Sequence, residues 1–407
     1  MSKKPILIIG GGISGITAAV EIAETGHEVI LIEEQPMLGG NVLKMNNYFP
    51  KFCPPTCGLE INFRRIRQNP RITCYTSTTV TEIKGEKGNF NVVLESAPLY
   101  VKNNCTACGK CTEVCPEIRP DTFNYGFGET KAIYLPHEMA YPMKYTIDEN
   151  FCKKEKCSKC KDVCDYDAID LYAGKTITRI KVSSVIVTTG WENYNATGID
   201  NLHYSDYENV VTNIEFERLL ALNGPGGKDV NRPSDKAIPK DIVFVQCAGS
   251  RDENHLPYCS AVCCSASLKH ALTLQEKYTD IKVKIFYIDL RVTGRNEDFL
   301  EKAIQNKNIE LIKGKVAGIE EIKDNKNLIV EAEDILSGKK IKHETQMVVL
   351  ATGIVPNCKI PGISTNNNGF LTETIDGIYS AACCKKPMDV SSSVKEATAA
   401  ALKAIQT

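Results

Sequence analysis

The feature that most constrains the fold of this chain is a glycine loop between an apolar strand and a helix. Residues 5–9 read PILII, and the pattern G-x-G-x-x-G follows directly at residues 10–15, where an apolar helical pattern begins. A second apolar run, residues 29–32, ends at Glu33. Strand, tight turn, helix and strand in this order form one βαβ unit with a parallel pair, so the sequence predicts an α/β fold that opens with a doubly wound domain.

Glycines at these spacings are typical of a dinucleotide-binding turn. They permit the tight turn, the approach of a pyrophosphate group to the backbone, and close packing of the helix on the strand. Glu33, at the end of the second strand, is then placed to accept hydrogen bonds from ribose hydroxyls. A plain glycine-rich turn is the alternative, but the register of strand, helix and acidic residue favours a nucleotide site.

Further signals resemble the flavoproteins with two dinucleotide-binding domains and favour FAD over NAD. A Gly-Gly pair follows the acidic residue in EEQPMLGGN, and two strands end in Thr189-Gly190 and Thr352-Gly353. Asp389 is the candidate for the acidic residue that such proteins place near the ribityl chain. The residues expected to contact FAD are Gly10, Gly12, Ser14, Gly15, Glu33, Gly39, Gly40, Asn41, Val80, Thr189, Gly190, Gly353 and Asp389.

The chain has 407 residues, a formal net charge of −1 and 18 cysteines. The charge balance gives no basic field for nucleic acid, and no apolar run approaches the roughly 20 residues of a membrane span. The start of the chain lacks the cleavage site of a signal peptide, so we expect a cytoplasmic protein that meets a membrane only through partner subunits. In a reducing compartment, so many cysteines indicate metal binding or redox chemistry rather than disulfides.

Eight cysteines form two runs of the kind found in bacterial ferredoxins. The first is C-x2-C-x2-C-x3-C-P, and the second is C-x4-C-x2-C-x3-C without the proline. In such runs three thiolates bind one [4Fe–4S] cube and the fourth reaches the neighbouring cube. Zinc is the alternative, because C-x2-C pairs also make tetrahedral zinc sites. The expected ligand sets are Cys105, Cys108, Cys111 and Cys164 for one cube, and Cys152, Cys157, Cys160 and Cys115 for the other.

Four more cysteines lie where the second βαβ series would carry a glycine loop for NAD(P)H. The strand at residues 241–246 runs into Cys247-Ala248-Gly249-Ser250, with one glycine only, which disfavours pyrophosphate binding there. Cys259, Cys263 and Cys264 follow near a helix start. A third iron–sulfur cluster, a dithiol/disulfide pair and buried structural thiols are the three interpretations, and we favour the cluster.

These segments also carry a family resemblance. FPKFCPPTCGLEINFRRI, FVQCAGSRDENHLPYCS and VCCSASLKHA resemble the A subunits of the quinone-interacting membrane-bound oxidoreductase complexes, within the family of heterodisulfide reductase A subunits. The resemblance covers nearly the whole chain and implies FAD, a thioredoxin-reductase-like core, and a [4Fe–4S] cluster at Cys247, Cys259, Cys263 and Cys264. The two ferredoxin runs are closer to the heterodisulfide reductase form, whereas the lack of a long C-terminal extension favours the quinone-linked form.

The expected organisation is two dinucleotide-binding, doubly wound domains with an inserted ferredoxin-like segment. An antiparallel appendage is expected at about residues 71–96. The expected parts are the first part of the FAD-binding domain (1–100), the insertion with two clusters (101–175), the return of the FAD-binding domain with a linker (176–240), a second Rossmann-like domain without the NAD(P) loop (241–350), and the C-terminal part of the FAD-binding domain (351–407).

The resemblance implies an electron-transfer protein that links the membrane quinone pool to adenylylsulfate reductase. The implied partners are a sibling subunit with flavin and iron–sulfur groups and a membrane subunit with haem and quinone sites; no catalytic acid or base is needed. The alternatives are a flavin-bifurcating subunit of heterodisulfide reductase, an NAD(P)H-dependent disulfide reductase using Cys53/Cys57 or Cys263/Cys264, and a scaffold whose clusters serve folding alone. Cys383-Cys384 lies near the expected C-terminal flavin contact, and Cys74 and Cys358 are expected to be packing residues.

Overall fold

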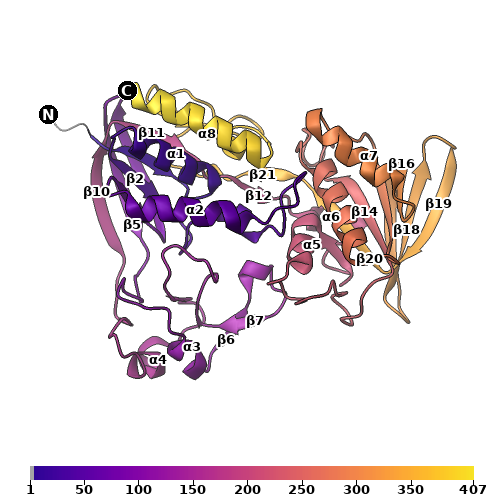
Figure 1. Ribbon diagram of the computed structural model, residues 1–407, viewed down its shortest axis with the longest axis horizontal. Coiled ribbons are helices and arrows are strands. Elements are labelled where there is room, and N and C mark those ends of the chain that lie inside the picture. Colours follow the sequence, from indigo (N-terminus) through magenta and orange to yellow (C-terminus); the bar gives the residue numbers. More distant parts are fainter. Residues whose placement is uncertain (1–3) are drawn as a thin grey trace. The chain divides into compact units, whose positions relative to one another are not determined.

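The computed structural model describes residues 4–407, which form two compact units. Unit 1 consists of the chain up to Leu43, Thr56–Trp191 and Pro356–Thr407. Unit 2 consists of Lys44–Pro55 and Glu192–Val355. Each unit is built around one parallel sheet, and Figure 1 labels their elements.

Unit 1 is organised on a five-stranded parallel sheet in the order β22-β11-β1-β2-β3. Its central strands are short apolar runs whose residues are almost all buried, as expected for a sheet covered on both faces. Helices α1 and α8 pack on each other and on this sheet. The elements are β1 (Ile6–Ile9), α1 (Ile13–Glu24), β2 (Val29–Ile32), α2 (Pro55–Gln68), β3 (Ile72–Tyr75), β11 (Ser184–Val187), β22 (Ile378–Ser380) and α8 (Val390–Ile405).

A three-stranded antiparallel sheet shares a hydrophobic core with this parallel sheet. It consists of β4 (Thr78–Glu86), β5 (Asn89–Ser96) and β10 (Thr176–Val182), in the order β10-β5-β4. Buried residues of β5, among them Phe90 and Val92, lie in one core cluster with Leu7 and Val187 of the parallel strands.

The prediction of an antiparallel appendage at residues 71–96 is wrong for the first strand of that segment. β3 pairs in parallel with β2, with Ile72 opposite Val29, because α2 returns the chain and makes a second βαβ crossover. β3 lies at the sheet edge and is only partly buried, so its alternating pattern resembles that of an antiparallel strand. β4 and β5 are antiparallel as expected.

The ferredoxin-like insertion has short elements and a small core. They are α3 (Lys110–Val114), β6 (Ile118–Pro120), β7 (Glu129–Lys131), β8 (Ile133–Tyr134), β9 (Thr146–Ile147) and α4 (Lys159–Asp162). Its core joins a few apolar side chains, such as Ile133 and Leu171, to cysteine side chains. Such a core has too little aliphatic surface to order the segment unaided.

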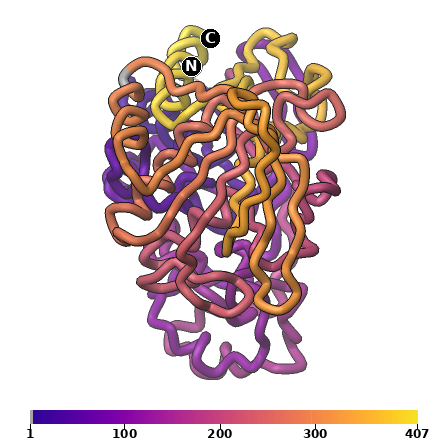
Figure 2. The backbone as a smooth tube through the Cα atoms, turned by 90° about the vertical axis from the view of Figure 1, so that its right-hand side faces the viewer, coloured from indigo at the N-terminus to yellow at the C-terminus, as the bar shows by residue number. Residues whose placement is uncertain are grey.

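Unit 2 contains a second five-stranded parallel sheet, in the order β13-β20-β14-β15-β16. The antiparallel strands β17, β18 and β19 share a core with it and run side by side in Figure 2. The elements are β12 (Trp191–Asn193), β13 (Val210–Thr212), α5 (Asn213–Leu220), β14 (Asp241–Ala248), α6 (Cys263–Lys277), β15 (Lys282–Tyr287), α7 (Glu297–Gln305), β16 (Ile309–Lys313), β17 (Val316–Ile322), β18 (Asn327–Asp334), β19 (Lys339–Thr345), β20 (Met347–Thr352) and β21 (Ile354–Pro356).

The domain assignment of residues 192–240 differs from the expected one, in which residues 176–240 formed the return of the FAD-binding domain and a linker. In the structure residues 192–240 belong to unit 2, because β13 pairs in parallel with β20, with Val210 opposite Val348. The pairing joins residues more than a hundred positions apart, so local composition could not indicate it.

Candidate functional site

The glycine loop has the geometry that a dinucleotide-binding turn requires. Gly10 has φ +105°, and a side chain there would come within 2.5 Å of the Thr188 carbonyl oxygen. A methyl group at Gly15 would overlap the Gly10 carbonyl oxygen, so this glycine lets α1 pack closely on the loop. At Gly12, by contrast, the nearest atom lies 4.0 Å from the added carbon. The loop is therefore tight on its protein side and open at Gly12, where the motif places a pyrophosphate.

Glu33 and Gly11 form a contact that the sequence pattern did not single out. The Gly11 N–H donates to Glu33 Oε2 at 2.7 Å, and the Gln35 N–H donates to Glu33 Oε1 at 2.8 Å. Burial raises the pKa of Glu33 to about 7, and the two N–H donors oppose this rise. Because a side chain at Gly11 would collide with Leu38, the motif's variable second position is also constrained here.

Other predicted flavin residues gather around this loop. Gly39 bridges to Gly12, and its N–H donates to the Gly11 carbonyl at 2.8 Å. The Ser14 hydroxyl lies 3.5 Å from the Ser393 carbonyl, so the first turns of α1 and α8 meet. Helix N-termini carry partial positive charge, and two of them beside one loop suit an anionic pyrophosphate. The residues present thus fit FAD, which when bound supplies exchange of electron pairs.

The remaining predicted flavin residues have varied surroundings. Asn41 donates through Nδ2 to the Trp191 carbonyl at 2.7 Å, next to Gly190, which has φ +72°. Asp389 caps α8 by accepting the Ser392 N–H at 2.7 Å. The Val80 side chain lies in the unit 1 core. Gly40 begins a 3-10 turn, and Thr189 lies beside Cys358. Gly353 belongs to unit 2, where it lies against Ser250 and Ser260.

The eight insertion cysteines surround two cavities. Both cavities are small and partly open to solvent. The thiols around the first are those of Cys105, Cys108, Cys111 and Cys164, and those around the second are Cys115, Cys152, Cys157 and Cys160. The structure therefore brings together the same two sets that the ferredoxin spacing predicts, each with its fourth member from the other run.

A cubane cluster needs four thiols placed around a cavity, because each thiolate binds a different iron atom. In residues 4–407, no three His, Cys, Asp or Glu side chains converge tightly enough for a single metal ion. Burial, with Cys105 nearby, raises the pKa of Cys111 to about 11, and burial with Cys152 nearby does the same for Cys160. Such thiols become thiolates only beside a positively charged centre. The iron–sulfur assignment stays a prediction that this chemistry fits.

Cys247, Cys259, Cys263 and Cys264 also lie together, within unit 2. Burial raises the pKa of Cys263, and the three other thiols raise it further. Cys247 lies near the end of β14 with φ +56°, and Cys263 and Cys264 are the first residues of α6. Cys263 and Cys264 each interact electrostatically with other thiols of this group. The arrangement fits the predicted third cluster.

Arg251 and Lys269, which are near these thiols in the sequence, have different partners in the structure. Arg251 lies beside the Cys247 thiol and donates to Asp289 at 2.9 Å. Lys269 instead donates to both carboxylate oxygens of Glu217, at 2.5 and 2.7 Å, and to the Asn47 carbonyl at 3.0 Å. The charge of Lys269 is therefore paired with Glu217 rather than with these thiols.

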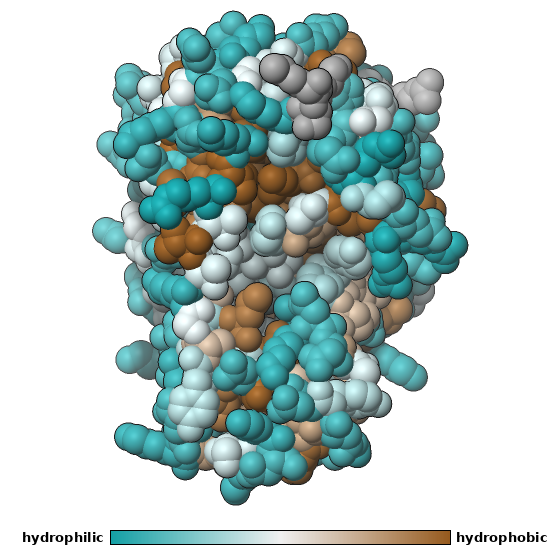
Figure 3. Space-filling view, turned by 90° about the vertical axis from the view of Figure 1, so that its left-hand side faces the viewer, coloured by the Kyte–Doolittle hydropathy of each residue, from teal (hydrophilic) through white to brown (hydrophobic). Residues whose placement is uncertain are grey.

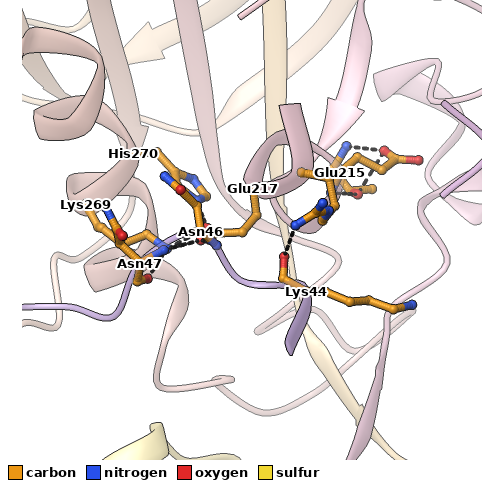
Figure 4. A network of polar contacts seen from close by, with 9 residues as sticks. Lys44, Asn46, Asn47, Glu215, Glu217, Lys269 and His270 are labelled. Atoms are coloured by element: carbon orange, nitrogen blue, oxygen red, sulfur yellow. Dashed lines mark hydrogen bonds and ion pairs between the residues drawn. The ribbon is translucent and has the colours of Figure 1, made fainter. Parts of the chain in front are cut away.

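Glu217 is the centre of a buried polar network that the sequence did not reveal (Figure 4). His270 also binds its carboxylate, and the Asn46 N–H donates to it at 2.7 Å. Burial disfavours the ionised carboxyl, but Lys269 and His270 together hold the pKa of Glu217 below its usual range. The network holds the Lys44–Pro55 segment on α5 and α6 of unit 2. That segment carries Cys53, whereas Cys57 lies in α2 of unit 1, and both thiols are exposed.

Comparisons with known proteins agree with the N-terminal site and the fold. A family model described as FAD-dependent oxidoreductase matches residues 5–49. Two thioredoxin reductases of solved structure, from Lactococcus lactis and T. acidophilum, are 14% and 13% identical to this chain, each with a TM-score of 0.55. The alignments cover 99% and 100% of this chain and 98% and 99% of those chains, and they show the fold alone. The predicted thioredoxin-reductase-like fold is confirmed.

Proteins that are similar in sequence to this chain are longer subunits of heterodisulfide reductases. The chain is 40% identical to the iron-sulfur A2 component of CoB–CoM heterodisulfide reductase from Methanopyrus kandleri, over 98% of this chain and 63% of that protein. It is 34% identical to the A component of the H2:CoB–CoM heterodisulfide, ferredoxin reductase from Methanothermobacter marburgensis, with the same coverage. The chain thus spans less than two thirds of the length of these relatives.

Within residues 4–407, no helix combines the length and the apolar character needed to cross a bilayer. By its nucleotide-binding segment, its fold and its relatives, this chain is an FAD-dependent oxidoreductase related to the A subunits of heterodisulfide reductases.

Proposed function

We propose that this chain is the flavin- and iron–sulfur-containing electron-transfer subunit of a heterodisulfide-reductase-type complex. The observation that carries the proposal is the crossed arrangement of the insertion thiols, in which Cys164 completes the first set and Cys115 the second. This crossing is typical of a pair of ferredoxin cubes that exchange single electrons. FAD in unit 1 would exchange electron pairs, and the clusters would accept and pass on single electrons.

Each part of the chain has a separate task in this proposal. The loop at Gly10–Gly15 and Glu33 hold the dinucleotide, and the insertion holds two [4Fe–4S] clusters. Cys247, Cys259, Cys263 and Cys264 hold the third cluster, in the place where a nicotinamide-binding loop would otherwise lie. No side chain acts as a general acid or base.

The test is anaerobic purification followed by flavin and iron analysis of matched variants. The wild type is expected to bind one FAD and about twelve iron atoms, since each cube has four. Cys111→Ser, Cys160→Ser and Cys259→Ala should each remove about four of them, with a matching loss of one paramagnetic signal after reduction. The control is Cys74→Ser, a partly buried thiol outside all three sets, which should leave the iron content unchanged. Zinc in place of iron, or equal loss in the control, would contradict the proposal.

The proposal also concerns the proteins with which this chain assembles. Relatives are A subunits of heterodisulfide reductases, which supports sibling subunits. A second candidate is a quinone-interacting complex that supplies adenylylsulfate reductase, favoured by FPKFCPPTCGLEINFRRI and FVQCAGSRDENHLPYCS. Hydrophobic side chains also gather in the upper part of the face drawn in Figure 3, as on surfaces that contact other proteins.

Purification from native cells with bound neighbours distinguishes these partners. A haem and quinone subunit that reduces this flavin when a quinol is added supports the quinone-linked complex. A heterodisulfide-reducing subunit supports the other. Bleaching of the flavin by NADH alone would instead favour the NAD(P)H-dependent disulfide reductase.

A further inference from the structure

Two cysteines that belong to none of the proposed sites lie against each other in unit 1. Cys358 follows β21, and Cys384 ends the 3-10 turn Ala382–Cys384, 26 residues later. The Cys358 thiol donates to the Cys384 carbonyl oxygen at 3.3 Å, so the two cysteines are in direct contact. Both belong to the hydrophobic core beside the parallel sheet. The sequence predicted a packing role for Cys358 and a position near the C-terminal flavin contact for Cys383-Cys384, because nothing local connects Cys358 with Cys384.

We propose that Cys358 and Cys384 form a redox-active dithiol that closes to a disulfide by exchange with a low-molecular-weight disulfide. Neither cysteine is one of the twelve predicted cluster ligands, and Thr189, a residue expected to contact FAD, lies beside Cys358.

The surroundings distinguish the two thiols. Cys358 is 8% exposed and is the outer one, whereas Cys384 is 0% exposed, with its sulfur 3.1 Å from the Val187 carbonyl and 2.9 Å from the Ala381 carbonyl. The neighbouring Cys384 thiol lowers the pKa of Cys358, although burial opposes it. The neighbouring Cys358 thiol, and then burial, raise the pKa of Cys384. An outer, more acidic thiol with an inner, less acidic one is the division found between attacking and resolving cysteines.

The exchange balances without any other reactant. The Cys358 thiolate attacks one sulfur of the small disulfide, RSSR, and releases one thiolate, which takes up the proton that Cys358 lost. Cys384 then loses its proton as its sulfur displaces the second thiolate from Cys358. The two protein thiols are oxidised to one disulfide, and RSSR is reduced to two RSH.

The experiment treats the intact, cofactor-loaded protein anaerobically with graded ratios of oxidised to reduced glutathione. Acid quenching, alkylation in denaturant and tryptic digestion follow, and Lys359 ensures that the two cysteines fall in different peptides. Peptide mass spectrometry should find these peptides joined, with a mass lower by two hydrogens and separated again by dithiothreitol. Cys74, whose pKa burial raises to about 12, serves as the control and should stay alkylated at every ratio.

Cys383 shares the second peptide, so variants decide which thiol reacts. The joined peptides should persist in Cys383→Ser and disappear in Cys384→Ser. Fragmentation of the wild-type peptide pair locates the bond even if a variant fails to fold. A link through Cys383, glutathione attached to Cys358 without a link, or both cysteines fully alkylated at every ratio would each overturn the proposal.

Discussion

The insertion and the cysteine group of unit 2 are both sets of thiols suited to clusters, but they relate to their surroundings in opposite ways. In the insertion, Cys111, Cys160 and four further ligand cysteines are themselves part of the core, beside few aliphatic side chains. In unit 2, Cys247 and Cys263 stand at the end of β14 and the start of α6, on a sheet with a core of its own. In the insertion the ligand cysteines form much of the hydrophobic core. In unit 2 a separate hydrophobic core holds the elements that carry the cysteines.

This difference predicts which sites unfold when they lose their cofactor. A segment whose core consists of metal ligands is ordered by the metal, because the binding free energy is also its folding free energy. A site carried by a packed sheet loses only the contacts that the cofactor made. Four experiments on the two units test these expectations.

The largest effect is expected from removing the iron of the insertion. In the double variant Cys111→Ser/Cys160→Ser, which removes one buried ligand from each set, amides of residues 101–175 should lose slow hydrogen exchange entirely. Amides of β1 and β11 should keep their protection, since their apolar core is intact. Hydrogen exchange with mass spectrometry measures both. An insertion that stays protected without iron would break the comparison.

A smaller effect is expected in unit 2. Cys259→Ala should remove about four iron atoms and yet cost unit 2 only about 1 kcal/mol of free energy of unfolding. The reason is that Cys259 is only partly buried and lies outside the core between the two sheets. Denaturant unfolding followed by exchange in β14 and β15 is the measurement. Loss of protection throughout β14 and β15 would show that this cluster too is needed for folding.

The flavin loop is a second site carried by a packed sheet, so it should also empty without unfolding. Gly12→Glu is expected to abolish FAD binding, because Gly12 faces open space and a carboxylate there would repel the pyrophosphate. Gly15→Ala offers the matched contrast. Its methyl group overlaps the Gly10 carbonyl, so it should cost on the order of 1–3 kcal/mol of stability. Flavin absorbance and urea unfolding separate the two, and full flavin occupancy in Gly12→Glu would refute the site.

The last prediction concerns the proton on Glu33 in flavin-free protein. Its pKa rises from 4.5 to about 7 on folding, so between these values the folded state binds more protons than the unfolded state. The free energy of unfolding should therefore fall as pH rises from about 4.5 to about 7, by at most about 3 kcal/mol, and change little above. In Glu33→Gln this contribution should vanish. Urea unfolding at several pH values checks it, and identical pH profiles for variant and wild type would contradict it.

Features that depend on neighbours in the chain could be predicted from the sequence. The glycine spacing of residues 10–15 predicted a βαβ turn because its contacts are made within one turn and two strands. The two ferredoxin runs predicted their four-thiol sets because ligand geometry at a cube restricts the spacing between cysteines.

Features that join distant segments were decided by the tertiary structure. The direction of β3, the place of residues 192–240 in unit 2, and the hold of Glu217 on Asn46 and Lys269 all join segments far apart in the chain. The pairing of Cys358 with Cys384 is of the same kind. Each of these features results from the packing of buried surfaces, and the free energy of that packing depends on all the segments that meet in the fold. No local sequence pattern therefore predicts them.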